Sequence, residues 1–263
     1  MSFSTSAQLI KNVEHFLEIK HYSFYERFFA KKGVFYGWGR RDSGLRAVRL
    51  AQKHKSSFVL LEDGFVRSTA LASQKSPSFS LIEDDVGIYY DATQKSKLEN
   101  ILNNYDFDEK LMSEATEAIS LMLRYNISKY NNSKDLAEDF FPNNGKKRIL
   151  IIAQTKNDAS LKYGLSEGFA TIDIIKAAAS ENANADIYIK LHPEVLSGSK
   201  LSDISAEDIP PFCHIITQDV NPLSLLKQVD KVYTKTSQMG FEALLLGKEC
   251  VCFGMPFYAG WGV

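Results

Sequence analysis

The 263-residue sequence is poor in cysteine, proline and net charge, and it contains no long uninterrupted hydrophobic run. Three cysteines, an odd number, are typical of a reducing compartment rather than of a disulfide-stapled fold. The 31 basic and 32 acidic residues give a net charge of −1, so no broad basic surface for duplex nucleic acid is expected. These absences predict a cytoplasmic protein without a nucleic-acid partner.

Membrane insertion and secretion are not predicted. Residues 250–263 form the longest nearly apolar stretch, but Gly254 and Pro256 interrupt it, and it is too short to cross a bilayer. The first residues lack the charged and apolar regions of a secretory signal. We therefore expect a soluble chain of one large domain or two small ones.

Two short patterns have a metal-binding interpretation. Cys250 and Cys252 would share one face of a strand, and with no second ligand pair after them, two small buried strand residues are the favoured interpretation. Asp106 and Asp108 spell the D-x-D pattern of metal-dependent sugar transferases. They lie between two predicted helices, however, where Asp108 is expected to be an N-cap. We therefore expect no metal and no other cofactor.

Short apolar strands alternate with helical patterns along the chain, which predicts parallel sheets covered by helices. Ser43 is expected to cap the second helix. In the first half the predicted strands are 33–38, 57–61, 79–82 and 87–90, and the predicted helices are 9–20, 43–54, 95–103 and 108–124. In the second half the predicted strands are 148–153, 186–191, 214–217, 232–234 and 249–253, and the predicted helices are 168–181, 221–228 and 239–246.

A polar stretch rich in Asn, Ser, Lys and Asp runs from residue 126 to 145 and separates the two halves. It predicts a linker or crossover, with an N-terminal domain at residues 1–143 and a C-terminal domain at residues 144–263. Two such units in tandem are expected to bind ligands in a cleft between them. The predicted fold class is therefore α/β, with two Rossmann-like halves.

Three polar clusters in the second half follow predicted strands directly, where α/β proteins place their sites. They span residues 154–158, 190–194 and 234–242. In the third cluster Thr236 and Ser237 precede a helix whose free N–H groups favour a phosphate. Gly240 would let a ligand approach the first turn, and Glu242 would accept hydrogen bonds from ribose hydroxyls. A Ser-capped helix that needs no ligand is the alternative.

The other two clusters have the same double interpretation. His192 ends a strand ahead of Pro193 and would donate to a phosphate or carboxylate with help from Lys190, although a strand-end histidine is often structural. Asp158 is one of several candidate acids, and a loop Asp is usually a turn or cap residue. Gln154 opens the first cluster.

The clusters, taken in order, resemble the N-terminal module of the KpsC/LipA capsule β-Kdo glycosyltransferases. No single segment is specific, but the ordered set is. The similar segments are residues 37–40, 61–68, 85–93, 127–131, 154–155, 158–160, 190–193, 219–222, 236–245 and 252–262.

The resemblance implies a GT-B-like fold, CMP-Kdo as donor and retention of the β configuration. It also implies that the product is a short poly-Kdo linker between a lipid and the capsule chain. Asp158 matches the proposed nucleophile, and His192, Ser237, Gly240 and Glu242 match the CMP-binding groups. With their neighbours in the same clusters, the expected donor-binding residues are Gln154, Lys190, His192, Thr236, Ser237, Gly240 and Glu242.

The acceptor is expected to be a Kdo-terminated glycolipid bound by the first half. Kdo carries a carboxylate, which Arg40 and Arg67 would grip in a bidentate manner. Glu62 or Asp63 would act as general base toward the acceptor hydroxyl. Solvated loop charge is the alternative for each of these residues taken singly.

The family continues beyond the point at which this sequence ends, so the C-terminal domain is expected to be truncated. Two other function classes fit the pattern. One is another GT-B transferase of surface polymers that uses CMP-sialic acid or a polyol phosphate donor. The other is a non-catalytic module that holds a nucleotide or glycan for a partner, and candidate partners include other capsule-assembly proteins at the inner membrane.

Overall fold

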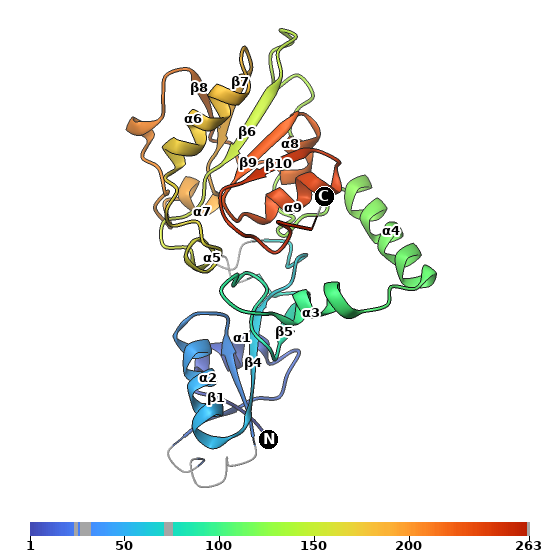
Figure 1. Ribbon diagram of the computed structural model, residues 1–263, viewed down its shortest axis with the longest axis vertical. Helices are drawn as coiled ribbons and strands as arrows, with labels where there is room; N and C mark the ends of the chain where they lie inside the picture. The colour runs from blue at the N-terminus through green and yellow to red at the C-terminus, as the bar shows by residue number, and fades with distance from the viewer. Residues whose placement is uncertain (24–25, 27–32, 71–75, 262–263) are drawn as a thin grey trace. The chain divides into compact units, whose positions relative to one another are not determined.

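The structure is a computed structural model that describes residues 1–23, 26, 33–70 and 76–261, in two compact units (Figure 1). The first unit is Met1–Asp106 and the second is Phe107–Val263. The sequence placed the domain boundary at 143/144, so residues 107–143 join the second unit instead of the first. Each unit is built on a five-stranded sheet.

The sheet of the first unit has the order β2-β1-β3-β4-β5. Its neighbours are parallel except for β4 and β5, which are antiparallel, so the prediction of a fully parallel sheet is wrong at this edge. The elements are β1 (Ser2–Ser4), α1 (Ala7–Val13), β2 (Lys20–His21), β3 (Val34–Trp38), α2 (Asp42–His54), β4 (Ser57–Asp63), β5 (Leu81–Asp84) and α3 (Lys97–Asn104).

Helices α1 and α2 pack on separate hydrophobic clusters of this sheet. Phe35 of β3 packs with Ala47 and Ala51 of α2, whereas Leu61 of β4 clusters with residues of α1. Helix α2 lies very close to β3, because a Cβ on Gly44 would be 1.9 Å from the carbonyl oxygen of Gly39. A larger residue at position 44 would therefore push α2 off the strand end.

Three local predictions for the first unit are wrong. The helix expected at 9–20 ends at Val13, because the chain turns back to pair β2 with β1. The strand expected at 87–90 is a turn, because the carboxylate of Asp84 gathers the backbone N–H groups of Val86, Gly87 and Lys97. Ser43 does not cap α2, since its Oγ accepts from the backbone N–H of Trp38 at 3.0 Å instead.

The sheet of the second unit is entirely parallel, with the order β10-β9-β6-β7-β8. This is the Rossmann order, in which the chain leaves the middle strand first to one side and then to the other. The elements are α4 (Glu109–Arg124), β6 (Arg148–Ile152), α5 (Ala159–Tyr163), α6 (Thr171–Glu181), β7 (Asp186–Lys190), α7 (Pro193–Leu196), a 3₁₀ turn (Ala206–Asp208), β8 (Cys213–Ile216), α8 (Pro222–Lys227), β9 (Lys231–Thr234), α9 (Gln238–Leu245) and β10 (Glu249–Cys252).

Alternate residues of β6 serve the two faces of this sheet, as the strand period requires. Ile149 and Ile151 pack with α6, and Leu150 and Ile152 pack with α8 and α9. Figure 1 shows α6 on one face and α8 and α9 on the other. The prediction of an α/β chain with two Rossmann-like halves is therefore confirmed.

The polar stretch 126–145 packs on the second unit instead of forming a linker. Phe141 and Leu136 lie in the core cluster beneath α8 and α9. The backbone N–H of Leu136 donates to Ser224 Oγ at 2.9 Å, and Lys134 bridges to Val220. Two apolar residues among many polar ones are enough to seat the segment on the sheet.

Candidate active site

The three polar clusters of the second half lie in the loops that follow β6, β7 and β9. These strands are neighbours in a parallel sheet, so their carboxyl ends lie along one edge. The topology thus brings Gln154, His192 and Thr236 to the same end of the sheet, as the sequence predicted from strand ends alone.

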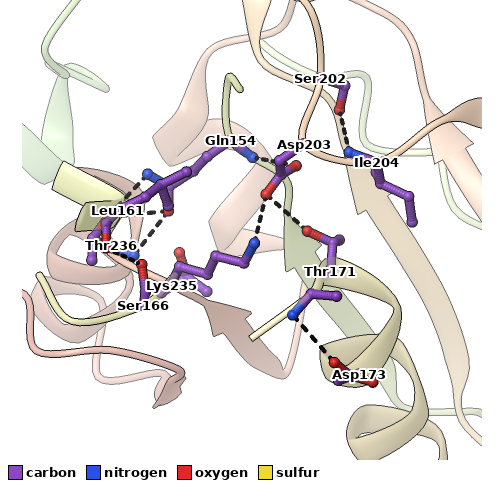
Figure 2. Close-up of polar contacts among 12 residues, drawn as sticks. Gln154, Leu161, Ser166, Thr171, Asp173, Ser202, Asp203, Ile204, Lys235 and Thr236 are labelled. Atoms are coloured by element: carbon purple, nitrogen blue, oxygen red, sulfur yellow. Dashed lines mark hydrogen bonds and ion pairs between the residues drawn. The ribbon is translucent and has the colours of Figure 1, made fainter. Parts of the chain in front are cut away.

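Gln154 joins the loop after β6 to the loop after β9. Its Oε1 accepts from the backbone N–H of Thr236 at 2.8 Å, and its Nε2 donates to Thr236 Oγ1 at 3.0 Å. Thr236 Oγ1 also lies 2.9 Å from Ser160 Oγ. Figure 2 shows Gln154 directed at Thr236. Since Gln154 is 5% exposed and its amide is occupied, the structure gives it an internal role beside the predicted one in donor binding.

Asp158 is the N-cap of α5, and its Oδ1 accepts from the backbone N–H of Ser160 at 2.9 Å. Asp158 therefore has the capping role that the sequence offered as the alternative interpretation. Asp158 remains half-buried, and its negative charge acts on His192. The structure thus brings the predicted nucleophile close to a predicted donor-binding group.

His192 presents one ring nitrogen to the protein. Its Nδ1 accepts from the backbone N–H of Glu194 at 3.1 Å, so in the neutral ring Nε2 carries the proton. Burial is the main cause that lowers the pKa of His192, although the nearby charge of Glu194 opposes it. A neutral His192 with a protonated Nε2 is suited to donate one hydrogen bond to an anionic ligand.

Lys190 lies beneath this edge rather than at its surface. The residue is 3% exposed, and its Nζ donates to the backbone oxygen of Gln218 at 3.0 Å. Burial lowers the pKa of Lys190 to about 8, although the charge of Asp219 opposes the change. Its positive charge can act on a bound anion electrostatically, but direct contact with a donor stays a prediction.

Helix α9 begins after Ser237, whose Oγ accepts from the backbone N–H of Met239 at 3.3 Å. The predicted space beside Gly240 is filled by the protein, because a Cβ there would be 2.2 Å from Tyr258 Oη. That hydroxyl donates to the backbone oxygen of Ser237 at 2.6 Å. Gly240 therefore admits Tyr258, and the aromatic ring braces the start of the helix.

Glu242 is fully buried, with 1% exposure, and its Oε1 accepts from Ser128 Oγ at 2.7 Å. Burial raises the pKa of Glu242 to about 7, while the hydrogen bond from Ser128 and the backbone and charge of Lys129 oppose the rise. This carboxylate ties the segment before the sheet to α9. The predicted role in ribose binding stays a prediction, since one oxygen already has a partner.

Sequence reasoning missed Asp203 and Lys235, which form a buried ion pair at 2.9 Å (Figure 2). Asp203 also accepts from Thr171 Oγ1 at 2.8 Å and from the backbone N–H of Gln154 at 3.2 Å. A signal existed for Lys235, which stands within the third polar cluster. Asp203 lies in a long polar loop, and no sequence pattern marked it as a site residue.

In the first unit, the two arginines predicted to bind the acceptor are paired with acids. Arg40 Nε lies 2.5 Å from Asp91 Oδ2, and these side chains are 8% and 2% exposed. Arg67 Nε lies 2.7 Å from Oδ1 of Asp63, the predicted general base. The sequence did not indicate these ion pairs, and the assignment of the arginines to the acceptor stays a prediction.

Glu62, the other candidate base, sits beside two aromatic groups. Its Oε1 accepts from Trp38 Nε1 at 2.9 Å. Burial and then the charge of Glu62 raise the pKa of Tyr90, whose hydroxyl accepts from the backbone N–H of Arg40 at 2.8 Å. Glu62 and Asp63 are thus both brought to the end of β4, as predicted, but each is engaged by a neighbour.

Within the described residues, no cluster of three or more His, Cys, Asp or Glu side chains is arranged to hold a metal ion. Asp108 is the N-cap of α4, as expected, with its side chain accepting from the backbone N–H of Leu111. Cys250 and Cys252 are half-buried on the edge strand β10, in keeping with the interpretation of small strand residues.

Residues 34–263 match a family described as capsule polysaccharide biosynthesis proteins. The chain belongs to this family. A solved structure of Thermosulfurimonas dismutans KpsC, described as a beta Kdo 2,4 transferase, is 38% identical, with a TM-score of 0.91 over 99% of this chain and 82% of that chain. A T. dismutans KpsC structure described as a beta Kdo 2,7 transferase is 31% identical, with a TM-score of 0.71 over 99% and 80%. The resemblance to the KpsC/LipA group is confirmed.

Curated relatives extend the same relationship to other bacteria. The capsule polysaccharide modification protein LipA of Neisseria meningitidis serogroup A is 41% identical over 230 residues, which are 86% of this chain and 33% of LipA. The lipopolysaccharide-processing protein LpsZ of Rhizobium meliloti is 35% identical over 84% of this chain and 51% of LpsZ. The chain thus spans between a third and a half of these family members. No helix in the described part of this family member has the length and apolar character needed to cross a bilayer.

Proposed function

We propose that this chain transfers Kdo from CMP-Kdo to a Kdo-terminated glycolipid during capsule polysaccharide biosynthesis, with retention of the β configuration. The observation that carries the proposal is the similarity to the KpsC beta Kdo 2,4 transferase, which extends over 99% of the chain. The parallel sheet of the second unit, with its polar loops at the carboxyl ends of three adjacent strands, supports it.

The second unit supplies the donor site in this proposal. The phosphate of CMP-Kdo would accept from Nε2 of His192 and would lie in the positive field at the start of α9. Lys190, 3% exposed, would add positive charge from beneath the ligand. A CMP-sugar carries a single phosphodiester, so these groups suffice to hold it, and we propose that no metal ion takes part.

Asp158 is the proposed nucleophile. Its carboxylate would attack the anomeric carbon of Kdo as the bond from that carbon to the CMP oxygen breaks, leaving a Kdo ester on Asp158. The acceptor hydroxyl, deprotonated by Glu62 or Asp63, would then displace Asp158 and form the new glycosidic bond. Two inversions give net retention. The hydrogen bond that the backbone N–H of Ser160 donates to Asp158 Oδ1 fixes the orientation of this carboxylate.

The same comparison supports one linkage over the other. Identity and TM-score are both higher for the beta Kdo 2,4 transferase than for the beta Kdo 2,7 transferase. We therefore favour transfer to the 4-hydroxyl of the acceptor Kdo. A location in the cytoplasm or at the cytoplasmic face of the inner membrane suits this chemistry, because activated sugar nucleotides are made there.

The deciding experiment supplies CTP, Kdo and a CMP-Kdo synthetase together with a Kdo-terminated acceptor. The expected result is extension of the acceptor by β-Kdo, with a 2,4 linkage in the NMR spectrum of the product. Transfer from CMP-sialic acid or from a polyol phosphate donor instead would assign the chain to a different transferase. Binding of CMP-Kdo without extension would identify a non-catalytic module.

A further inference from the structure

The carboxylate of Asp203 joins separate segments at the active end of the second sheet. It contacts Lys235 from the loop after β9, Thr171 from the start of α6, and the backbone of Gln154 from the loop after β6. Figure 2 shows these dashed contacts converging on the Asp203 side chain. One side chain thus sets the spacing of the two loops that carry the predicted nucleophile and the start of α9.

The backbone around Asp203 reinforces this connection. The N–H of Asp203 donates to the oxygen of Gln154 at 3.0 Å, and the N–H of Lys156 donates to the oxygen of Leu201 at 2.8 Å. Thr155 and Ser202 form an antiparallel bridge between these two bonds. Residues 201–203 therefore run alongside the loop that leads to Asp158.

A short chain of hydrogen bonds continues from this clamp to the Asp158 carboxylate. Gln154, fixed at its backbone by Asp203, holds Thr236 through both atoms of its amide. The hydroxyls of Thr236 and Ser160 lie 2.9 Å apart. The backbone N–H of Ser160 in turn donates to Asp158 Oδ1.

The burial of the Asp203–Lys235 pair indicates a role other than stability. The two side chains are 8% and 7% exposed, and removing two charges from water costs about as much as their attraction returns. An apolar pair would stabilise the fold equally well. What an ion pair with two further hydrogen bonds to its carboxylate provides is one fixed arrangement of the segments that it joins.

We propose that Asp203 is a positioning residue that holds the loops bearing Asp158 and Thr236 in the arrangement required for sugar transfer. The proposal rests on the transferase function proposed above. In this proposal Asp203 contacts neither donor nor acceptor, so its loss is expected to misplace Asp158 while leaving His192, on the loop after β7, in place. Misplacement of about 1 Å lowers turnover by as much as roughly 100-fold.

The test compares Asp203→Asn with Asp186→Asn, a matched control. The Asp186 side chain is 11% exposed, against 8% for Asp203, and it pairs with a lysine, Lys146, at 3.1 Å, but it lies at the opposite end of the same sheet. For Asp203→Asn we expect kcat to fall roughly 10- to 100-fold, with the KM for CMP-Kdo within about threefold of wild type. Asp186→Asn should keep the wild-type kcat. Wild-type kcat in a folded Asp203→Asn variant, or an equal loss in Asp186→Asn, would overturn the proposal.

Hydrogen exchange gives a readout that does not depend on activity. In Asp203→Asn the peptides covering 154–163 and 234–238 should exchange faster than in wild type, while the α8 peptide should not change. Unchanged exchange in both loops would overturn the proposal even if wild type transferred Kdo normally. Inactive wild-type protein would remove the proposed function alone, because the exchange result still decides what Asp203 holds.

A milder variant covers the case in which Asp203→Asn does not fold. Thr171→Val removes one hydrogen bond to Asp203 and leaves the ion pair intact. It should raise exchange in the same two loops and lower kcat about two- to fivefold, with the KM for CMP-Kdo unchanged. Wild-type exchange and kcat in a folded Thr171→Val variant, alongside an unfolded Asp203→Asn, would reduce Asp203 to a stability role.

Discussion

Both units place charged residues just past parallel strands, but they use these residues differently. In the first unit Arg40 and Arg67 are each paired at 2.5–2.7 Å with an acid of the same unit. In the second unit the ion pair of Asp203 with Lys235 is buried beneath the loops at the carboxyl ends of the strands. His192 and Asp158 use only one side-chain atom each for local backbone contacts.

The difference shows that a charge at a strand end is an ambiguous signal until its partner is known. Ion pairs that close on themselves organise a loop, whereas groups fixed from one side keep another atom available for a ligand. By this criterion the second unit is the better candidate for the reactive site. In the first unit the charged residues brace loops.

The largest expected effect is in the second unit, at Asp158. Asp158→Asn keeps an acceptor oxygen for the Ser160 cap, so the fold and the CMP affinity should be unchanged. Turnover should fall by roughly 10³-fold or more, because the proposed nucleophile is lost. Steady-state kinetics and CMP calorimetry measure the two quantities. Asp173→Asn, another aspartate that accepts a helix-start N–H, is the control and should retain its kcat.

In the first unit, the loss of an arginine should lower the stability of the fold. Arg40→Met leaves the buried Asp91 carboxylate without its ion-pair partner and should lower the free energy of unfolding by about 3–5 kcal/mol. Arg41→Met, at the exposed neighbouring position, should change it by less than about 0.5 kcal/mol. Denaturant titration measures both. Equal stability of the two variants would show that Arg40 does not brace the loop, and would favour its predicted role at the acceptor.

A pH-dependent effect is expected from Glu242. Its pKa is raised to about 7, so the folded protein holds the proton at pH values where the unfolded chain has lost it. Stability contributed by this group therefore falls as the pH rises from about 4.5 to 7, by about 3 kcal/mol. Glu242→Gln should flatten the profile in this range, and the exposed Glu207→Gln should not. If both variants kept the pH dependence of the wild-type stability, the raised pKa of Glu242 would be contradicted.

The smallest expected effect concerns donor binding at His192. His192→Ala should weaken CMP binding by about 1–3 kcal/mol, because the phosphate loses one donor, and should leave cytidine binding unchanged. The control is His214→Ala, on the exposed face of β8. Calorimetry measures the affinities for CMP and for cytidine, and repeating it with EDTA tests whether a metal is required. A strict metal requirement, or an equal loss for cytidine, would contradict this account of the donor site.

The strands of the second unit were predictable because buried runs such as 149–152 are almost entirely β-branched or aliphatic. Strand-end position also predicted Gln154, His192 and Thr236 together, since parallel topology fixes that proximity. What failed depends on contacts distant in sequence. The turn at 87–90 exists because Asp84 gathers backbone N–H groups, and β5 runs antiparallel without any local sign.

The partners of the site residues were the least predictable part. Ser128 meets Glu242 across 114 positions, and Asp203 meets Lys235 across 32. Either carboxylate, considered in the sequence alone, has the same chemistry as a solvated one. Burial and pairing, which decide what each acid does, appear only after the chain has folded.

The most direct test of the account is to trap the Kdo ester on Asp158. Full-length protein is mixed with CMP-Kdo in the absence of acceptor and examined by intact-protein and peptide mass spectrometry. The account predicts one added Kdo, mapped to the peptide that contains Asp158, and its loss when acceptor is added. An adduct on another residue, or acceptor extension at the wild-type rate by Asp158→Asn, would contradict it.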